Sequence, residues 1–271
     1  MNKILLVGAG HMGGALLNGW LKAKIKNISV IDPNMRLNKK NKKFRYYKSI
    51  KEIKNIESFD TIFFAVKPQI IDDVIKDYKI LFNKKKLIIS IVAGINIRYF
   101  EDFFGSNSPI VRTMPNLPAS VGKGVSCLCS NRNVSKKHKG YIDKLFKSVG
   151  KSFWIKSEKT VDKITAISGS GPAYFYYFIE GLERAGLKLG LNRELSRELS
   201  KHTAFGAIDL MEKSNAEAMY MRKKIAITGG TTEAAIKKLK LNNKLHNTIL
   251  QGVQAAYRRA VQIGKKKKKT K

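Results

Sequence analysis

The sequence predicts an α/β protein in which a doubly wound, mostly parallel sheet is followed by an all-helical half. Three observations support this prediction. Short apolar runs rich in β-branched residues alternate with helical segments over the first 156 residues, which is typical of a parallel sheet with helices on both faces. Beyond residue 156 the strand signals largely stop and helical periodicity follows. A glycine-rich turn also joins the first strand directly to the first helix.

The elements of the first half follow from the apolar runs and their period. We expect strands at 3–7, 28–31, 61–66, 87–92, 109–113 and 123–129, and helices at 13–23, 49–55, 69–82 and 96–104. Sheets of this kind bind ligands beyond the carboxyl ends of their strands. Three strand ends carry distinctive sequences, namely Ala65–Pro68, Val92–Gly94 and Arg112–Pro118. Each is either a functional loop or a plain strand-ending turn.

The turn after the first strand, Gly8–Gly13, has the pattern G-x-G-x-x-G between a strand and a helix. In this setting Gly8 permits the tight turn, Gly10 lets the backbone approach a pyrophosphate, and Gly13 lets the helix lie close to the strand. The N–H groups at the helix N-terminus favour phosphate. Asp32 ends the second strand, near the place of an adenosine ribose. The motif predicts a dinucleotide-binding Rossmann domain; the alternative is a glycine turn in an ordinary α/β unit.

The second half is predicted to be helical, with helices at 160–188, 193–213, 215–224, 231–240 and 243–264. The segment Ser168–Tyr174 contains two glycines and a proline, and we expect it to kink or thin the first helix. Its exposed backbone suits either a tight helix crossing or a bound ligand. The pair Gly229-Gly230 precedes Thr231 and Thr232 at a helix start. That arrangement is either a well-capped helix or a site for a carboxylate or phosphate.

Length, composition and charge bear on the number of domains and argue against membrane and nucleic-acid-binding proteins. A chain of 271 residues suits two domains, which we place at 1–156 and 157–264, before a basic, disordered tail at 265–271. Without a long apolar stretch or a leader before the first strand, we expect a cytoplasmic protein with no membrane partner. The net charge of +33 is spread over surface-type segments with no nucleic-acid-binding motif. We therefore expect no nucleic-acid partner, and interpret the charge as compositional bias that attracts anionic ligands.

Cysteine and histidine residues give no sign of a metal site. Cys127 and Cys129 alternate along a predicted strand, which favours two packed thiols over a redox or metal pair. The four histidines show no metal-ligand spacing. We expect no bound metal.

Six blocks of the chain also match one enzyme family in order and spacing: Gly8–Gly13, Ala65–Gln69, Ser90–Ile95, Met114–Ala119, Ser168–Tyr174 and Gly229–Thr232. Together they resemble pyrroline-5-carboxylate reductases, which catalyse the last step of proline biosynthesis. The resemblance implies a Rossmann domain, a helical substrate and dimerisation domain at 157–264, and an active site between the domains. It further implies a homodimer through the C-terminal helices, with higher oligomers possible.

The resemblance implies roles for individual residues. The residues for the cofactor are Gly8, Ala9, Gly10, His11, Met12 and Gly13 at the pyrophosphate, Asp32 and Asn34 at the adenosine end, and Ala65, Val66, Lys67, Pro68, Val92, Ala93 and Gly94 at the ribose and nicotinamide. The carboxylate of 1-pyrroline-5-carboxylate would bind the N–H groups of Gly230, Thr231 and Thr232. The Thr232 hydroxyl, as the catalytic group, would hydrogen-bond the ring nitrogen.

The cofactor is implied to be NADPH or NADH. Asp32 favours NADH, because its charge would repel a 2′-phosphate. Arg36, Lys39 and Lys40 stand nearby in the sequence and could instead neutralise that phosphate.

The chain departs from the family at three places: Ile227-Thr228 stands where the family has Ser-Pro, His11 stands where asparagine is frequent, and Ala218–Met221 replaces a Pro-Gly pattern. The sequence argues against two rival functions. β-Hydroxyacid dehydrogenases and related imine reductases share the opening motif, but they carry a catalytic lysine in the region where Ala173–Glu180 has none. A non-catalytic dinucleotide-binding protein would have no need of Gly229–Thr232.

Overall fold

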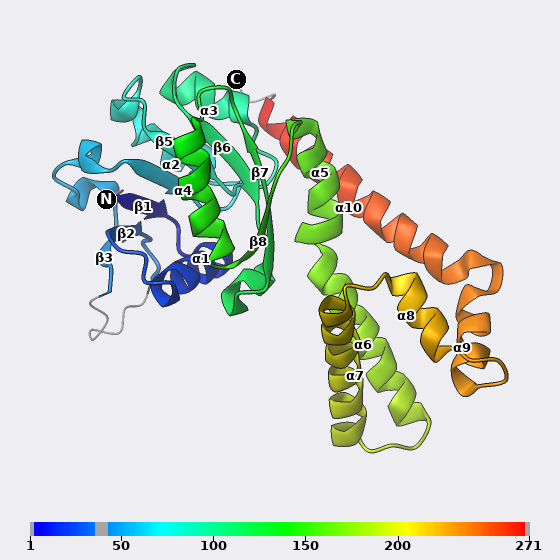
Figure 1. Ribbon diagram of the computed structural model, residues 1–271. Coiled ribbons are helices and arrows are strands. Elements are labelled where there is room, and N and C mark those ends of the chain that lie inside the picture. The colour runs from blue at the N-terminus through cyan, green and yellow to red at the C-terminus, as the bar shows by residue number, and fades with distance from the viewer. Residues whose placement is uncertain (1–2, 36–42, 269–271) are drawn as a thin grey trace. The chain divides into compact units, whose positions relative to one another are not determined.

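The computed structural model describes residues 3–35 and 43–268 (Figure 1). The chain divides into two compact units: Met1–Ser170 together with Ala256–Lys271, called here the first unit, and Gly171–Ala255, the second unit. The sequence predicted a boundary at residue 156, whereas the first unit continues to Ser170 and includes the end of the last helix. Among the described residues, no helix combines the length and the apolar character needed to cross a membrane.

The first unit is built on one eight-stranded sheet with the order β3-β2-β1-β4-β5-β6-β7-β8. Its strands are β1 (Ile4–Val7), β2 (Ile28–Ile31), β3 (Arg45–Tyr47), β4 (Thr61–Phe64), β5 (Leu87–Ser90), β6 (Ile110–Met114), β7 (Gly124–Ser130) and β8 (Gly150–Trp154). All neighbours pair in parallel except β6 and β7, which are antiparallel. The order 3-2-1-4-5-6 is that of a doubly wound Rossmann sheet, as the alternating pattern predicted.

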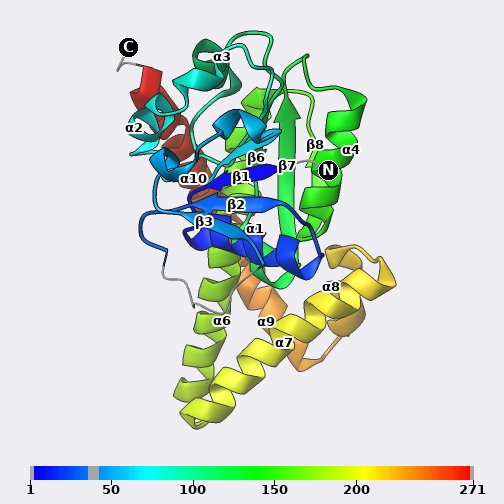
Figure 2. The same ribbon diagram turned by 90° about the vertical axis from the view of Figure 1, so that its left-hand side faces the viewer.

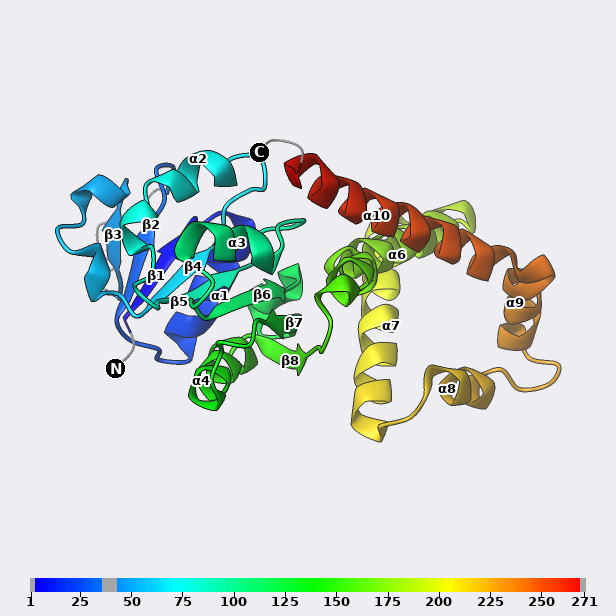
Figure 3. The same cartoon turned by 90° about the horizontal axis from the view of Figure 1, so that it is seen from above.

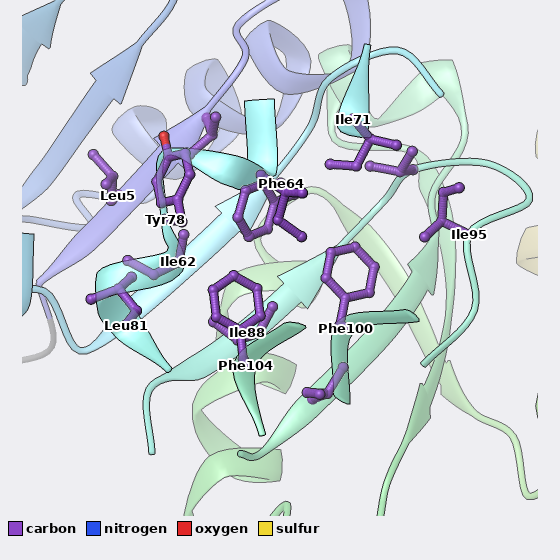
Figure 4. Close-up of a cluster of buried hydrophobic side chains, with 14 of the residues drawn as sticks. Leu5, Ile62, Phe64, Ile71, Tyr78, Leu81, Ile88, Ile95, Phe100 and Phe104 are labelled. Atoms are coloured by element: carbon purple, nitrogen blue, oxygen red, sulfur yellow. The ribbon is translucent and has the colours of Figure 1, made fainter. Parts of the chain in front are cut away.

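Helices cover both faces of the sheet. Figure 3 shows α2 (Ile71–Lys76) and α3 (Ile97–Phe104) on one side, and α1 (His11–Lys22) and α4 (Lys136–Lys147) on the other. Each side has its own apolar core, because successive strand residues point to opposite faces. Phe64 contacts the rings of Tyr78, Phe100 and Phe104 on the α2–α3 side (Figure 4). Its neighbour Phe63 contacts Trp20 on the other side, at 5.1 Å between ring centroids.

Three elements of the first unit were not expected from the sequence: the edge strands β3 and β8, and helix α4, which lies along β8 (Figure 2). Helix α4 is rich in lysine and contains Gly140, so its apolar stripe of Ile142, Leu145 and Phe146 is narrow. Two expected helices are shorter than predicted. The segment 49–55 forms only a 3₁₀ turn, Ile50–Glu52, and 69–82 forms α2 followed by a 3₁₀ turn.

The two thiols are buried in strand β7, as predicted for packed cysteines. Burial raises the pKa of both the Cys127 and the Cys129 thiol. A raised pKa keeps a thiol protonated and unreactive at neutral pH.

Helix α4 begins with a capping box, which gives a first prediction. The Ser135 hydroxyl accepts the His138 N–H at 3.1 Å, and the imidazole Nδ1 of His138 accepts the Ser135 N–H at 3.4 Å. Replacement Ser135→Ala should lower the free energy of unfolding by about 1 kcal/mol, the usual value of an N-cap. Urea denaturation at pH 7.5 would measure this loss, and an unchanged midpoint would contradict it.

The same cap should respond to pH. Burial, with a smaller contribution from Lys137, lowers the pKa of His138. The neutral imidazole is the form that accepts the Ser135 N–H, so its contribution is complete above the ordinary pKa of about 6.5 and is lost as the pH falls through the lowered folded-state pKa. His138→Gln cannot titrate, and the stability difference between it and the wild type should therefore shrink from pH 7.5 to pH 5.

The chain leaves the sheet through a distorted helical segment. After α5 (Val161–Ile164), residues Thr165–Gly169 form a π-helical turn in which the Ser170 N–H donates to the Thr165 carbonyl at 2.9 Å. The next helix, α6, begins at Gly171. The interruption predicted at Ser168–Tyr174 is thus present, as a widened turn ahead of Pro172 rather than a kink within a continuous helix.

The second unit consists of α6 (Gly171–Lys188), α7 (Arg193–Ser214), α8 (Ala218–Ile225), α9 (Thr231–Lys240) and the start of α10 (Lys244–Lys268). Helices α6 and α7 pack together as a hairpin. Helix α10 continues through Lys268, so residues 265–268 are helical where a disordered tail was expected. Many large apolar side chains of the unit are exposed, including Phe175 at 61% and Phe205 at 69%. Exposure on this scale indicates a surface that a partner covers.

Candidate active site

The loops after β1, β4 and β5 lie side by side at the carboxyl edge of the sheet. Val7, Phe64 and Ser90 are in register at the three strand ends. The Ala65 N–H donates to the Val7 carbonyl at 2.8 Å, and the Ile91 N–H donates to the Phe64 carbonyl at 3.0 Å. The structure therefore brings together Gly8–Gly13, Ala65–Pro68 and Val92–Gly94, which the sequence assigned to one ligand.

Glycine stands at each of the three motif positions of the first loop for a different geometric reason. Gly8 has a φ of +92°, and a Cβ there would lie 2.8 Å from the Ala65 carbonyl oxygen. A Cβ on Gly13 would lie 2.2 Å from the Gly8 carbonyl oxygen, so only glycine allows helix α1 this close to the strand. A Cβ on Gly10 would meet nothing within 4 Å. Gly10 thus leaves open space in front of the loop, as a backbone that approaches a ligand requires.

The N-terminus of α1 is suited to an anion. Gly10 is the N-cap, no side chain caps the helix, and its first turn contains no acidic residue. The first N–H groups of a helix lack intrahelical acceptors and carry a partial positive charge. Gly10 and His11 are exposed there. This geometry fits the pyrophosphate of a dinucleotide.

Asp32 holds the glycine loop. One carboxylate oxygen accepts the Ala9 N–H at 2.7 Å, and the other accepts the Asn34 N–H at 2.8 Å. A contact with the adenosine ribose stays a prediction for Asp32 and Asn34. Arg36, Lys39 and Lys40, which the sequence offered for a 2′-phosphate, lie outside the described residues.

Tyr46 is a member of this region that sequence reasoning missed. Its hydroxyl donates to the Asp32 carbonyl at 2.8 Å and lies 3.3 Å from the Met35 carbonyl. Tyr46 belongs to the unexpected strand β3, whose three residues Arg45–Tyr47 form no apolar run, so the sequence carried little signal for it. Tyr46 thereby ties the end of β2 to the sheet edge beside the glycine loop.

The loop after β5 packs against the end of the last helix. Gly94 has a φ of +75°, and a Cβ there would lie 2.6 Å from Cγ2 of Ile263. The side chain of Val92 is buried in the core, so a ligand could reach only its backbone. Lys67, in the loop after β4, is exposed. The assignment of these loops to the ribose and nicotinamide stays a prediction.

Asn116 lies in a block that the sequence singled out, but its structural role was not expected. Its side-chain oxygen accepts the Val125 N–H at 2.8 Å, and its Nδ2 donates to the Ser168 carbonyl at 3.1 Å. The buried Asn116 therefore joins the end of β6 to the π-helical turn. In the block Met114–Ala119, at least one polar residue is structural.

The second glycine pair forms the start of α9 in the second unit. Gly229 has a φ of +75°, and Gly230 is the N-cap without a side-chain hydrogen bond. Thr232 is half-buried in the first turn. The N–H groups of this turn can receive an anionic group in the same way as those of α1.

Glu233 organises this turn, a role that was not expected from the sequence. Its carboxylate accepts the Gly229 N–H at 2.9 Å and forms an ion pair with Lys237 at 3.1 Å. The hydrogen bond from Gly229, followed by that from Lys237, lowers the pKa of Glu233. Glu233 thus fixes the glycine turn in a chain that lacks the proline of the family's Ser-Pro.

Comparisons with known proteins agree with both halves of the chain. The family model for pyrroline-5-carboxylate reductase dimerisation matches residues 158–263, and that for NADP oxidoreductase, coenzyme F420-dependent, matches residues 3–94. Pyrroline-5-carboxylate reductase of Pseudomonas aeruginosa is 33% identical over 265 residues, which are 96% of either chain.

Solved structures give the same result. The pyrroline carboxylate reductase of Plasmodium falciparum with NADP bound is 37% identical, with a TM-score of 0.85 over 97% of this chain and 98% of that one. A pyrroline-5-carboxylate reductase from Coxiella burnetii is 31% identical, with a TM-score of 0.87 and the same coverage. The chain belongs to the pyrroline-5-carboxylate reductase family, which confirms the resemblance carried by its six sequence blocks.

Proposed function

We propose that this protein reduces 1-pyrroline-5-carboxylate to L-proline with NADPH or NADH. The observation that carries the proposal is the glycine loop with its open approach at Gly10, on a Rossmann sheet in a chain of this family. The open space in front of Gly10 leaves room for a pyrophosphate, and the uncapped start of α9 supports a place for the substrate carboxylate.

The residues of the candidate site suit separate roles in this reaction. Bound NADPH or NADH supplies the hydride. Gly8–Gly13 hold the pyrophosphate, and the loops after β4 and β5 orient the nicotinamide. The N–H groups of Gly230, Thr231 and Thr232 hold the substrate carboxylate. A hydride adds to the imine carbon and a proton ends on the ring nitrogen, which gives the secondary amine.

The proposed reaction needs positioning more than a strong acid. A cyclic imine is readily protonated near neutral pH, and the iminium already accepts a hydride well. The enzyme must chiefly hold the imine carbon about 3–3.5 Å from the hydride donor. This accounts for a site built from backbone N–H groups and one hydroxyl, that of Thr232, without a His–Asp pair.

Removal of the Thr232 hydroxyl tests the substrate end. Thr232→Ala should lower kcat about five- to tenfold, the value of one hydrogen bond of about 1–1.4 kcal/mol, while NADPH affinity stays unchanged. Thr232→Ser keeps the hydroxyl and should retain most of the activity. Steady-state kinetics and a separate NADPH titration distinguish the two effects. Loss of NADPH affinity in Thr232→Ala would place the residue at the cofactor instead.

Removal of the Glu233 carboxylate tests the organisation of the glycine turn. Glu233→Ala loses the acceptor for the Gly229 N–H and should raise KM for the imine about tenfold, because misplaced N–H groups bind the substrate carboxylate less well. Glu233→Gln keeps an acceptor oxygen and should restore most of the affinity. An unchanged KM in Glu233→Ala would show that the turn holds its shape without this contact.

Oxidation of NADPH and NADH, followed by absorbance with pyrroline-5-carboxylate present and absent, tests the activity and ranks the cofactors. Imine-dependent oxidation is expected. Protein that binds NADPH but shows no such oxidation would contradict the proposal.

The chain carries the dimerisation domain of its family, and we infer a homodimer formed through the second unit, with higher oligomers left open. The exposed side chains of α6 and α7 support this inference. A cytoplasmic location, and the expectation that neither nucleic acid nor membrane is a partner, stay predictions from the sequence.

A further inference from the structure

A cavity of the first unit lies at the edge of the sheet opposite the glycine loop. Its volume is about 680 Å³. It is lined by the loop after α1, the starts of β4 and β5, and helix α4. These are the amino ends of the parallel strands, whereas Gly8–Gly13 follows a carboxyl end. The cavity is therefore separate from the candidate active site, and its volume is within the range of small-molecule sites.

The wall of this cavity is strongly basic. Seven of its lining residues are lysines, namely Lys24, Lys26, Lys84–Lys86, Lys137 and Lys144, against one carboxylate, that of Asp60. Asp60 already accepts the N–H of Lys3 at 2.8 Å. Such a concentration of like charge is unfavourable unless an anion offsets it.

Most of these ammonium groups are available to a ligand. Lys84 lies 3.4 Å from a carboxylate oxygen of Glu57, and Lys86 donates to the Glu57 carbonyl at 2.6 Å. For the other five lysines, no carboxylate of the described part of the chain lies within 4.0 Å. These five lysines come from three segments that are far apart in the sequence: the loop after α1 (Lys24 and Lys26), the turn before β5 (Lys85) and helix α4 (Lys137 and Lys144). The fold therefore gathers them around one space.

The cavity wall also contains uncharged residues. Thr61 is one of the lining residues, but its side chain is fully buried, so its hydroxyl is not presented to a ligand. The ring of Tyr141 and the side chain of Ile25 add apolar surface to the wall. A ligand that fits carries several negative charges and a flat or apolar part.

We propose that this lysine cavity binds a nucleoside polyphosphate, with the phosphate chain among the lysines and the base on the side of Tyr141 and Ile25. Lysine ammonium groups bind phosphate as mobile point charges. This site would act independently of the dinucleotide site, because the two lie at opposite edges of the sheet.

Calorimetric titrations with ATP and with inorganic triphosphate test the proposal at one fixed ionic strength. The cavity variant is Lys26→Gln/Lys137→Gln/Lys144→Gln. The matched control is Lys51→Gln/Lys54→Gln/Lys159→Gln, which removes three exposed lysines that do not line the cavity. Both variants lose the same net charge. A difference in their ligand affinity therefore reports binding in the cavity, and not the electrostatic attraction of the whole protein for anions.

Wild type and control should bind both ligands, with ATP the tighter. The cavity variant should bind ATP at least about tenfold more weakly, because it loses three close charge–charge interactions, while its NADPH affinity stays that of the control. If both variants lost the same ATP affinity, the binding would reflect non-specific electrostatic attraction, and the proposed site would be wrong. Equal affinity of the wild type for ATP and triphosphate would overturn the placement of the base, and no binding of either ligand would overturn the proposal outright.

Discussion

Replacement of Gly10 by leucine is expected to abolish dinucleotide binding without unfolding the protein. The position has an ordinary φ of −63°, and a Cβ there meets nothing within 4 Å, so the folded chain has room for a side chain. That room is the approach to the N–H groups of α1. Loss of one charge-assisted hydrogen bond to phosphate, worth about 1.5–3 kcal/mol, would weaken NADPH binding about ten- to hundredfold. Exclusion of the whole pyrophosphate should weaken it further.

The measurement is a fluorescence titration with NADPH, accompanied by thermal unfolding of the same protein. Gly140→Leu is the matched control, because Gly140 is exposed in α4 and a Cβ there also meets nothing within 4 Å. Its NADPH affinity should stay unchanged. Gly13 could not serve as such a probe, since its Cβ would strike the Gly8 carbonyl and disturb the fold itself. Undiminished NADPH affinity in Gly10→Leu would refute the assignment of this loop to the cofactor.

The geometry of the glycine loop could be predicted from the sequence because it depends on local backbone constraints. The spacing of Gly8, Gly10 and Gly13 specifies a turn, an opening and a close helix contact, and the structure has all three. The role of Asp32 as an anchor for the Ala9 N–H could not be predicted. That contact joins residues 23 positions apart, and it depends on how the loop and the end of β2 meet in space.

The missed elements have physical reasons of their own. Strand β3 has three residues and lies at the sheet edge, and β8 alternates half-buried with exposed residues, so neither presents a continuous apolar run. In α4 the lysines mask a narrow apolar stripe. The pattern of apolar residues in a segment identifies strands and helices that are buried on both faces more readily than those that are buried on one face.

The helices of the second unit were largely predictable, but their packing was not. Periodicity places apolar residues along α7, yet it cannot say whether they meet the same chain or another one. In the structure, Leu199 and Phe205 are exposed while Ser196 and Ser200 are buried against α6. The position of Gly186 explains part of this inversion, since a Cβ there would lie 2.8 Å from the Ser196 hydroxyl. Small residues bring α6 and α7 close together, and the large ones point outward.

Replacement of Arg112 by methionine is expected to cause a large loss of stability. The Arg112 side chain is 5% exposed, and its guanidinium contacts Glu158 at 3.1 Å and Asp162 at 3.0 Å. Glu158 also accepts the Ile97 N–H at 2.8 Å, so one cluster links β6, the start of α3 and the segment that leads to α5. Arg112→Met would leave two largely buried carboxylates without their cation. Breaking a buried pair in this way costs about 3–5 kcal/mol.

A matched surface pair separates this effect from the loss of any arginine. Arg98 pairs with Asp102 at 2.8 Å, but its side chain is 73% exposed, and Arg98→Met should cost at most about 1 kcal/mol. Urea unfolding of both variants at pH 7.5 gives the comparison. Arg112 lies within β6 and opens the segment Arg112–Pro118, which the sequence left open as a functional loop or a plain strand-ending turn. A large loss of stability in Arg112→Met, with NADPH affinity retained in the folded protein, would assign Arg112 to the scaffold. Equal, small losses in both variants would mean that the carboxylates reach water or other donors once the guanidinium is gone, and that the cluster adds little to the fold.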